Sequence, residues 1–372
     1  MTLKRTNVLV PLALLAVATL AFSTPFAFAT STECSPAGST GLTTLWTAHS
    51  NQVISNKTID ATGCDIGIYV PPGSTNAAII GNSITGAGIH GIFVQDSRHI
   101  LISNNNVYGN SGGVPALSCD FINPPCINEG KAIQLSGTSD SVILQNTVTQ
   151  DLFGGIAVTD DGEIDPGALN PGNANPANHN LIIGNTITEV SNDCGIVVAV
   201  YNPEIARDNL IANNYVKGSP PPFGVNPYVG QIVVATDGPF ATISHTVVEG
   251  NTLDRSTLPG IVVHSNAPGD SISRTVIRQN TLGNNGYYPP FFSSPNTPVA
   301  SDGPTGISIV AEAYPDMPSP PTITGTTLSH NTIGPDTNGV WLCQTTGTTI
   351  KATPDKGSDV TNALVTCASG GS

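Results

Sequence analysis

Short apolar bursts alternate along most of the chain with polar residues and turn residues. One burst follows an asparagine in the pattern Asn-x-Ile, as in Asn185-Thr186-Ile187, and the next begins at a glycine in the pattern Gly-Ile-x-Val, as in Gly195-Ile196-Val197-Val198. Nine such pairs follow one another in strict order, and each Asn-x-Ile unit has an apolar pair just upstream. Repetition at a nearly fixed period predicts a repeat architecture.

The period and the segment length predict stacked strands rather than helices. The shortest spacing, from Asn82 to Asn105, is 23 residues, which is too short for a βαβ unit of roughly thirty residues. Bursts of three to five residues that end at Gly, Asn or Pro fit short strands joined by turns. The fold class predicted is therefore all-β: a parallel β-helix, or solenoid, of about nine coils with terminal caps and lateral insertions.

Each repeated residue has a predicted structural role. In Gly195-Ile-Val-Val198, Ile196 and Val198 should point into the core while Val197 points outward, because side chains alternate along a strand. We expect the glycine to permit the bend into the strand. Asn185 and its equivalents should occupy turns and hydrogen-bond to one another from coil to coil as a ladder.

The first 29 residues resemble a secretory signal peptide. Lys4 and Arg5 precede an apolar run over residues 8–22, and Ala27-Phe28-Ala29 forms a small-x-small cleavage pattern. We therefore predict a signal peptide over 1–29, an N-terminal cap over 30–52, β-helix repeats over 53–342 and a C-terminal cap or tail over 343–372. The product should be secreted or held at the cell surface, with no membrane span.

Charge and cysteine content narrow the function classes. The formal net charge of −14 disfavours nucleic acid as a partner. Export makes disulfides permissible, and nearness in sequence suggests three pairs and leaves Cys194 over. The suggested pairs are Cys34–Cys64, Cys119–Cys126 and Cys343–Cys367.

The alternating Asn-Thr-Ile and Gly-Ile-x-Val units resemble the right-handed parallel β-helix repeats of secreted pectate-lyase-like proteins, including the NosD-type repeat group. The resemblance covers about residues 53–342 and is specific for the fold. It implies extracellular polysaccharide as the partner, bound along a lateral groove and cleaved if the chain is a lyase or glycoside hydrolase. Such proteins also include adhesins, so a non-catalytic surface or matrix scaffold is the alternative.

Candidate chemistry lies where insertions interrupt the regular coils. The sequence Val158-Thr-Asp-Asp-Gly-Glu-Ile-Asp165 places four carboxylates after one strand, and Lys131 closes the preceding insertion. A lone lysine at such a place is more often solvated than part of a site, so a solvated side chain is expected for Lys131. Paired carboxylates can divide into general acid and base, or they can bind Ca²⁺ through oxygens. The candidate catalytic residues are Asp160, Asp161, Glu163, Asp165 and Lys131, and the calcium alternative uses Asp160, Asp161 and Asp165. The candidate substrate-binding residues at the strand exits are Asp96, Asp237, His264 and Glu312.

Overall fold

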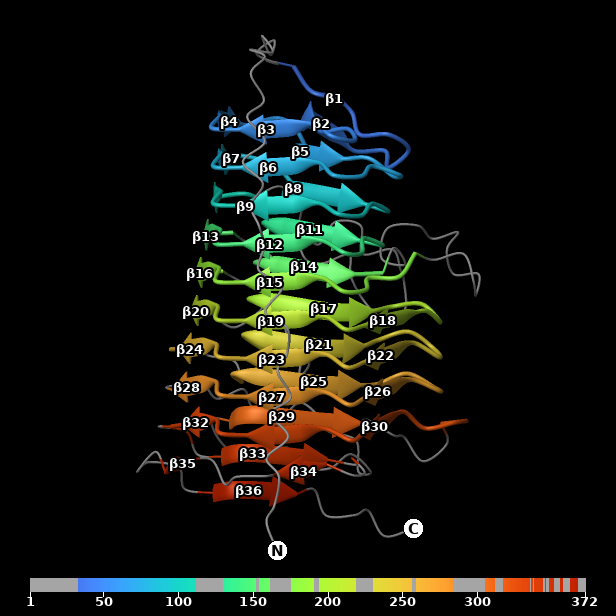
Figure 1. Cartoon of the computed structure of the whole chain (residues 1–372), viewed down its shortest axis with the longest axis vertical. Helices are drawn as coiled ribbons and strands as arrows, with labels where there is room; N and C mark the ends of the chain where they lie inside the picture. Colours follow the sequence, from blue (N-terminus) through green and yellow to red (C-terminus); the bar gives the residue numbers. More distant parts are fainter. Residues whose placement is uncertain are drawn as a thin grey trace, which may run out of the picture. The chain divides into compact units, whose positions relative to one another are not determined.

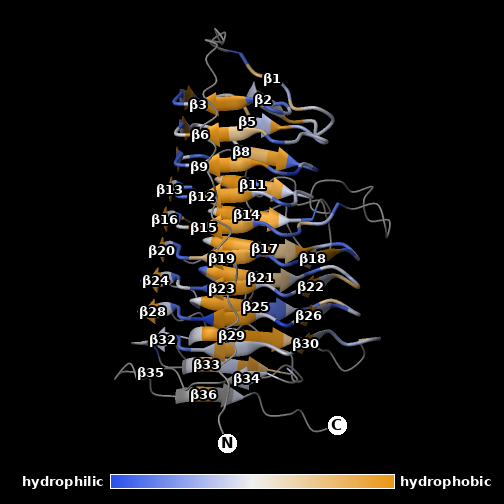
Figure 2. Ribbon diagram, viewed as in Figure 1, coloured by the Kyte–Doolittle hydropathy of each residue, from blue (hydrophilic) through white to orange (hydrophobic). Residues whose placement is uncertain are grey.

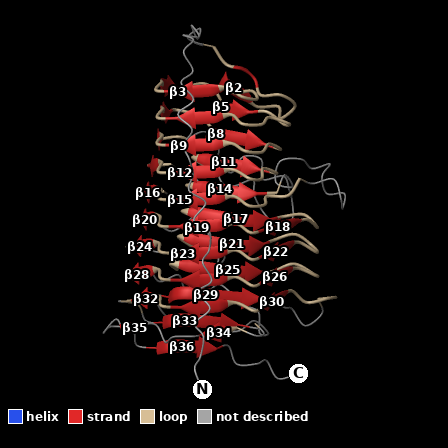
Figure 3. Ribbon diagram, in the orientation of Figure 1, coloured by secondary structure: helices blue, strands red, loops and turns tan. Residues whose placement is uncertain are grey.

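The computed structural model consists of short strands and the turns between them (Figure 3). The chain divides into residues 1–32 and 33–372, and every described residue belongs to the second part. The structure describes residues 33–111, 130–151, 154–160, 175–190, 194–218, 230–255, 259–283, 285, 305–311, 317–334, 336, 338–343, 345, 348–350, 355–356 and 362–366.

The predicted Gly-Ile-x-Val bursts form one long sheet, here called sheet A (Figure 1). Its twelve strands include all nine predicted bursts, preceded by β1 and β2 and followed by β36. The strands are β1 (Ser35–Pro36), β2 (Thr43–Thr47), β5 (Ile66–Val70), β8 (His90–Gln95), β11 (Ile133–Ser136), β14 (Ile156–Thr159), β17 (Ile196–Val200), β21 (Ile232–Thr236), β25 (Ile261–Ser265), β29 (Thr305–Ala311), β33 (Asn338–Cys343) and β36 (Asn362–Thr366).

The apolar pairs upstream of each asparagine form a second sheet, sheet B. Its strands are β3 (Val53–Ser55), β6 (Ala78–Ile80), β9 (Leu101–Ser103), β12 (Val142–Leu144), β15 (Leu181–Ile183), β19 (Leu210–Ala212), β23 (Val247–Glu249), β27 (Val276–Arg278), β31 (Thr327–Ser329) and β34 (Thr349–Ile350).

The Asn-x-Ile units form a third sheet, sheet C. Its strands are β4 (Thr58–Asp60), β7 (Ser83–Thr85), β10 (Asn106–Tyr108), β13 (Thr147–Thr149), β16 (Thr186–Thr188), β20 (Tyr215–Lys217), β24 (Thr252–Asp254), β28 (Thr281–Gly283), β32 (Thr332–Ile333) and β35 (Asp355–Lys356).

Each coil runs through sheets B, C and A in that order, and the next coil begins again in sheet B. Four later coils add a short strand between sheets A and B, which forms sheet D. Its strands are β18 (Ile205–Arg207), β22 (Thr242–Ser244), β26 (Ser271–Ser273) and β30 (Thr322–Thr324). All pairings between coils are parallel, as predicted.

Like side chains stack on like inside the coils. Ile196 pairs with Ile156 on one side and Ile232 on the other, and Val198 lies between Val158 and Val234. All of these side chains are buried in one continuous core, whereas Val197 lies outside it. The predicted alternation of inward and outward residues is confirmed.

A glycine stands at the start of most of the repeated sheet A bursts, with Ala132 and Gln231 in two of them, and the structure gives it a different cause from the predicted bend. A Cβ at Gly195 would lie 2.5 Å from Val216 Cγ1 and 2.7 Å from the carbonyl oxygen of Gln231. Contacts that short do not occur for real Cβ atoms, so the chain enters the strand too close to the next coil for a side chain. Glycine is required here by close packing.

The predicted asparagine ladder is present at the turn between sheets B and C. Asn185 donates from its backbone nitrogen and from Nδ2 to Asn214 Oδ1, at 2.9 and 3.0 Å. Its Nδ2 also donates to the carbonyl oxygen of Ile143, and its own Oδ1 accepts both donors of Asn146. The ladder comprises Asn82, Asn105, Asn146, Asn185, Asn214, Asn251, Asn280 and Asn331, all buried.

Strands also lie in the two segments expected to be caps. β1 pairs antiparallel with β2, and Cys34 is joined to Cys64 by the predicted disulfide. At the other end, β34, β35 and β36 continue sheets B, C and A.

The other cysteines are described in part. Cys343 is disulfide-bonded and Cys194 is a buried thiol. Cys119, Cys126 and Cys367 lie outside the described residues, so the pairings predicted for them remain predictions.

Candidate functional site on the outer face of sheet A

The outward side chains of sheet A form the face on which the sequence places most of its candidate residues. In the sequence, the long insertions precede or follow strands of this sheet: residues 112–129, 219–229 and 286–304 precede β11, β21 and β29, and residues 161–174 follow β14. Although they point away from the core, the outward residues on the central strands are buried. The central outward position is occupied by Tyr69, Phe93, Gln134, Ala157, Val197, Val233, Val262, Ser308 and Trp341.

Three rings are stacked in the first coils of this face. The Tyr69 and Phe93 ring centroids are 5.7 Å apart with planes inclined by 23°, and the His90 and Phe93 centroids are 5.0 Å apart. The Tyr69 hydroxyl donates to Gln95 Oε1 at 2.9 Å. Burial, with a smaller contribution from the Asp96 carboxylate, raises the pKa of Tyr69 to about 12, so its hydroxyl stays protonated. The outward aromatic side chains are covered, in agreement with the sequence prediction.

His90 contacts Lys131 in the next coil. The backbone nitrogen of Lys131 donates to His90 Nδ1 at 3.2 Å, so the neutral ring carries its proton on Nε2. Burial and, to a lesser degree, the Lys131 charge lower the pKa of His90 to about 3. The imidazole is therefore neutral over the physiological pH range.

Lys131 itself is buried, with 4% of its surface exposed, which differs from the solvated lysine expected. Its side chain passes over Gly154 in the following coil: a Cβ at Gly154 would lie 2.6 Å from Lys131 Cδ and 3.3 Å from Nζ. The missing side chain of Gly154 thus makes room for the aliphatic part of Lys131. The Lys131 side chain is therefore confined beside the outward side chains of sheet A.

Asp160, the only member of its predicted carboxylate cluster among the described residues, has a structural role. It is fully buried, and its two carboxylate oxygens accept the backbone N–H groups of Tyr201 and Asn202 at 3.0 and 2.9 Å. Asp160 therefore holds the turn of the next coil. Asp161, Glu163 and Asp165 lie outside the described residues, and so does Glu312.

A second polar group lies four strands further along sheet A. Asp237 follows β21, His264 is on β25, and Asp237 Oδ1 lies 3.6 Å from His264 Nδ1. Burial lowers the pKa of His264 to about 3, which keeps this imidazole neutral as well. Thr236 and Ser265 hydrogen-bond beside them at 2.8 Å. The structure thus brings together two of the predicted substrate-binding residues from adjacent coils.

The predicted substrate-binding residues do not form one continuous row. Asp96 belongs to the first group of coils and contributes to the environment of Tyr69. Between it and the Asp237–His264 pair lies an apolar patch. Four strand spacings of about 4.8 Å place the two groups roughly 19 Å apart along the stack. The patch consists of Ala157, Cys194, Val197, Ala199, Val233, Ala235 and Val262.

The sequence prediction missed part of the polar network. Gln134 Nε2 donates to Thr159 Oγ1 at 2.9 Å across β11 and β14, and the Ser136 hydroxyl donates to the Asp160 carbonyl oxygen at 3.2 Å. Gln134 lies between the apolar residues Phe93 and Ala157, whereas Ser136 lies between the polar residues Gln95 and Thr159. A glutamine at the x position of Gly-Ile-x-Val was the available signal.

Metal binding gains no support from the described geometry. Within the described ranges, no three His, Cys, Asp or Glu side chains form a group that could hold a metal ion. Two of the three residues proposed for calcium, Asp161 and Asp165, lie outside those ranges. The calcium site therefore remains a prediction.

Comparison with known proteins identifies the fold. A family model described as a right-handed beta helix region matches residues 29–166. No curated protein matches the sequence. The described part of the chain also contains no helix long and apolar enough to cross a membrane.

Three solved structures illustrate the similarity. The Agl-KA catalytic domain is 11% identical with a TM-score of 0.38, and the alignment covers 88% of this chain and 61% of that one. PfbA, a surface adhesin of Streptococcus pneumoniae, is 13% identical with a TM-score of 0.33 and 84% coverage of both chains. A GH87 alpha-1,3-glucanase catalytic domain in complex with tetrasaccharides is 12% identical with a TM-score of 0.31, covering 88% and 63%.

The chain thus spans less than two thirds of the Agl-KA and GH87 domains. The family model and the parallel ladders between coils agree, and the chain folds as a right-handed parallel β-helix.

Proposed function

We propose that this is an exported β-helix protein that binds an extracellular polysaccharide on the outer face of sheet A. The observation that carries the proposal is the grouping of stacked rings, an amine and a side-chain amide directly beneath one face: Tyr69, Phe93 and His90 beside Lys131 and Gln134, all of them buried. Aromatic rings with a few oriented polar groups are the usual composition of a ligand site.

Export is supported by two independent features. The N-terminal pattern of Lys4-Arg5, an apolar run and Ala27-Phe28-Ala29 is typical of a signal peptide. The Cys34–Cys64 disulfide fits an oxidising compartment outside the cytosol. A polysaccharide is the ligand class that an exported solenoid with this face would meet there.

Binding is favoured over cleavage because the described carboxylates are engaged otherwise. Asp160 accepts two backbone N–H groups, so a proton transfer at this carboxylate would disrupt the turn that it holds. Asp237 faces a neutral imidazole roughly 19 Å from the ring cluster. No pair of described carboxylates faces a shared position on this face.

The test is a panel of neutral and acidic polysaccharides assayed for binding by calorimetry and for cleavage by release of reducing ends or unsaturated products. Lys131→Met should lower the affinity for the bound polysaccharide at least about tenfold, the effect of losing one buried charged contact. Lys217→Met, on β20 of sheet C, is the matched control and should bind like the wild type. If the wild type binds no member of the panel, the proposal is rejected and a scaffold role is favoured. If the wild type releases products, the protein is an enzyme and does not merely bind the polysaccharide.

A further inference from the structure

The outer face of sheet B has two outward positions in each strand, and one of them is aliphatic in eight coils. The other is mixed: Ile80, Leu144, Ile183 and Ala212 lie in the middle strands, with Ser55, Ser103 and the Glu249–Arg278 ion pair among and beyond them. Most of the sheet B ribbon is hydrophobic by hydropathy (Figure 2). The first outward position of eight successive strands, β3 to β27, carries only Val, Ala or Leu, and these side chains are partly exposed. We call this row the aliphatic stripe; it consists of Val53, Ala78, Leu101, Val142, Leu181, Leu210, Val247 and Val276.

The repeat alone does not produce the aliphatic stripe, because sheet C of the same coils lacks such a row. The corresponding outward position of sheet C is polar or aromatic in the same coils: Thr58, Ser83, Asn106, Thr147, Thr186, Tyr215, Thr252 and Thr281. Contiguous exposed apolar surface of this kind marks an interaction site more often than chance. Its flatness, set by parallel strands in register, suits another flat sheet.

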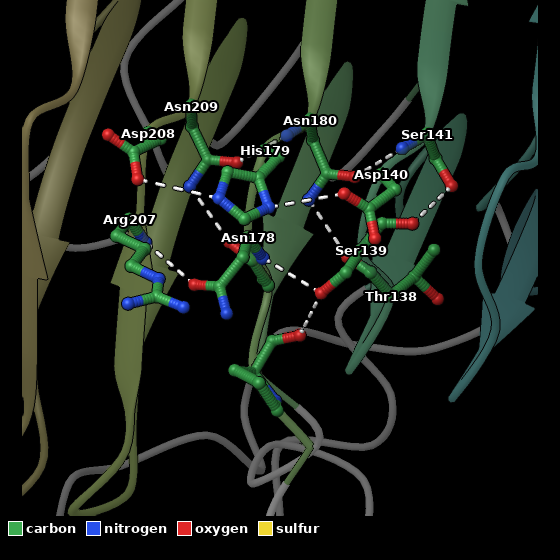
Figure 4. A network of polar contacts seen from close by, with 12 residues as sticks. Thr138, Ser139, Asp140, Ser141, Asn178, His179, Asn180, Arg207, Asp208 and Asn209 are labelled. Carbon is green, nitrogen blue, oxygen red and sulfur yellow. Dashed lines mark hydrogen bonds and ion pairs between the residues drawn. The ribbon is translucent and has the colours of Figure 1, made fainter.

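A row of polar and charged residues borders the stripe where the chain enters sheet B. These residues all have positive φ and stack one above another; we call them the charged column, which consists of Asn51, Asn76, His99, Asp140, His179, Asp208, His245 and Arg274. His179 lies between two acids, with Nδ1 3.1 Å from Asp140 Oδ1 and Nε2 3.5 Å from Asp208 Oδ2 (Figure 4). Each of these three side chains is nearly half exposed.

We propose that the aliphatic stripe is the interface of a homodimer in which two copies pack sheet B against sheet B with their coils stacked in opposite directions. The two-fold axis runs parallel to the strands, between the coils of β12 and β15. This operation reverses the order of the coils but keeps the charged column of each copy beside that of the other. The contact is isologous, as in most dimers.

The apolar residues match under this axis. Val142 faces Leu181 of the second copy, and Leu101 faces Leu210, so the bulkiest side chains meet at the centre. Ala78 faces Val247, and Val53 faces Val276 at the ends. The stripe therefore overlaps itself over its whole length only when the axis lies at its centre.

The charged column matches under the same axis without further adjustment. Asp140 faces His179 of the second copy and His99 faces Asp208, which places an imidazole donor opposite a carboxylate at four sites. His245 faces Asn76 and Arg274 faces Asn51, so no two like charges are opposed. One axis thus satisfies the apolar row and the charged row, and this agreement selects a second copy over an unrelated partner.

The size of the face is adequate for such a dimer. Eight strands about 4.8 Å apart extend over roughly 34 Å, and three strand residues with a turn residue on each side span about 16 Å. The flat area is about 550 Å² per copy, without the additional surface of protruding side chains. A standard interface buries about 800 Å² per partner. The dimer should therefore be reversible at low micromolar concentration.

The first experiment measures the oligomeric state of the purified protein by sedimentation velocity between about 1 and 100 μM. The wild type should sediment as a dimer, and Leu181→Lys should be a monomer because the ammonium group would be buried at the centre of the contact. Thr186→Lys, in the same coil on sheet C, is the control and should remain dimeric. A monomeric wild type at 100 μM, or a dimeric Leu181→Lys protein, overturns the proposal.

The second experiment tests the orientation. Ala78 and Val247 are five sheet B strands apart, about 24 Å, within one chain, but they face each other between antiparallel copies. The double variant Ala78→Cys/Val247→Cys should form a covalent dimer on mild oxidation, well above the level of the wild type, and Ala78→Cys alone should not. A covalent dimer from the single variant, or none from the double variant, overturns the antiparallel arrangement.

Discussion

Two columns of turn residues bound the same strands of sheet B, and they differ in how strictly the sequence repeats. The buried column at the exit is asparagine in eight successive coils. The exposed column at the entrance holds amide, imidazole, carboxylate and guanidinium groups in turn, although its backbone is as regular, with φ from 53 to 61° from Asn51 to Arg274.

Access to water explains why the buried column is uniform and the exposed column is varied. A buried Asn must both accept from the coil before it and donate to the coil after it, and only a side-chain amide of this length does both. An exposed side chain can complete its hydrogen bonds with solvent, so only a tolerance of positive φ is required, and Asn, Asp and His meet it more readily than other residues. The same residue therefore recurs from coil to coil where a buried side chain must complete its hydrogen bonds with the neighbouring coils.

The largest expected effect breaks the buried column. Asn185→Ala removes the acceptor of two Asn146 donors and the donor to the Ile143 carbonyl oxygen. Three buried groups left unsatisfied at about 1–3 kcal/mol each lower the free energy of unfolding by about 5 kcal/mol. Urea denaturation checks this value. Asn106→Ala, an exposed asparagine on β10, should change it by less than about 0.5 kcal/mol, and equal effects would refute the role of burial.

The second effect concerns the buried imidazole of His90. Because its folded-state pKa is depressed to about 3, below the usual 6.5, its stabilisation is complete above pH 6.5 and is lost as the pH falls toward 3. Between pH 7 and pH 3, the free energy of unfolding of His90→Gln should fall by about 4 kcal/mol less than that of the wild type. Thermal unfolding between pH 7 and 3 is the measurement. His245→Gln, at an exposed position, is the control variant for the substitution itself.

The third effect has the opposite sign. Asp270 is buried and accepts the N–H groups of Ala241 and Ala267, and burial raises its pKa to about 7. A raised pKa gives stability that is complete below pH 3.8 and is lost as the pH rises toward 7. The free energy of unfolding of Asp270→Asn, measured against that of the wild type, should therefore be about 2 kcal/mol higher at pH 7.5 than at pH 4. This value allows for solvent screening. Unchanged pH dependence relative to the wild type would contradict this.

The smallest expected effect lies in the exposed column. His179→Asn removes both contacts to Asp140 and Asp208 but keeps a side chain that tolerates positive φ. Exposed ion pairs contribute little, so the free energy of unfolding should fall by less than about 0.5 kcal/mol. Urea denaturation at low and high salt is the measurement, and a loss above 2 kcal/mol would show that the column stabilises the fold as the asparagine ladder does.

The strands and the core were predictable because their cause is local and repeated. Ile187, Ile196 and Val198 recur at fixed places in every coil, and alternation along a strand decides which of them point inward. The asparagine ladder was predictable for the same reason. The glycine at the start of most sheet A bursts was predicted for a bend, whereas its cause is contact with the next coil, as at Gly195.

The candidate site was less predictable, because it depends on which residues the coils bring together. Asp237 and His264 are 27 positions apart in the chain yet 3.6 Å apart in space. Lys131 was expected to be solvated and is buried against His90 and Gly154. Asp160 stood out as a carboxylate after a strand, but its partners, Tyr201 and Asn202, come from a turn that no local pattern identifies.

The sequence by itself determined the β-helix, the register of its coils and the asparagine ladder, since each of these follows from like residues meeting like at a fixed period. Only the tertiary structure decided which polar groups of sheet A are buried together and that one outer face, sheet B, presents an unbroken aliphatic row beside a charged one. The physical reason is that a repeat fixes the contacts between equivalent positions, whereas a site arises from contacts between positions that are not equivalent.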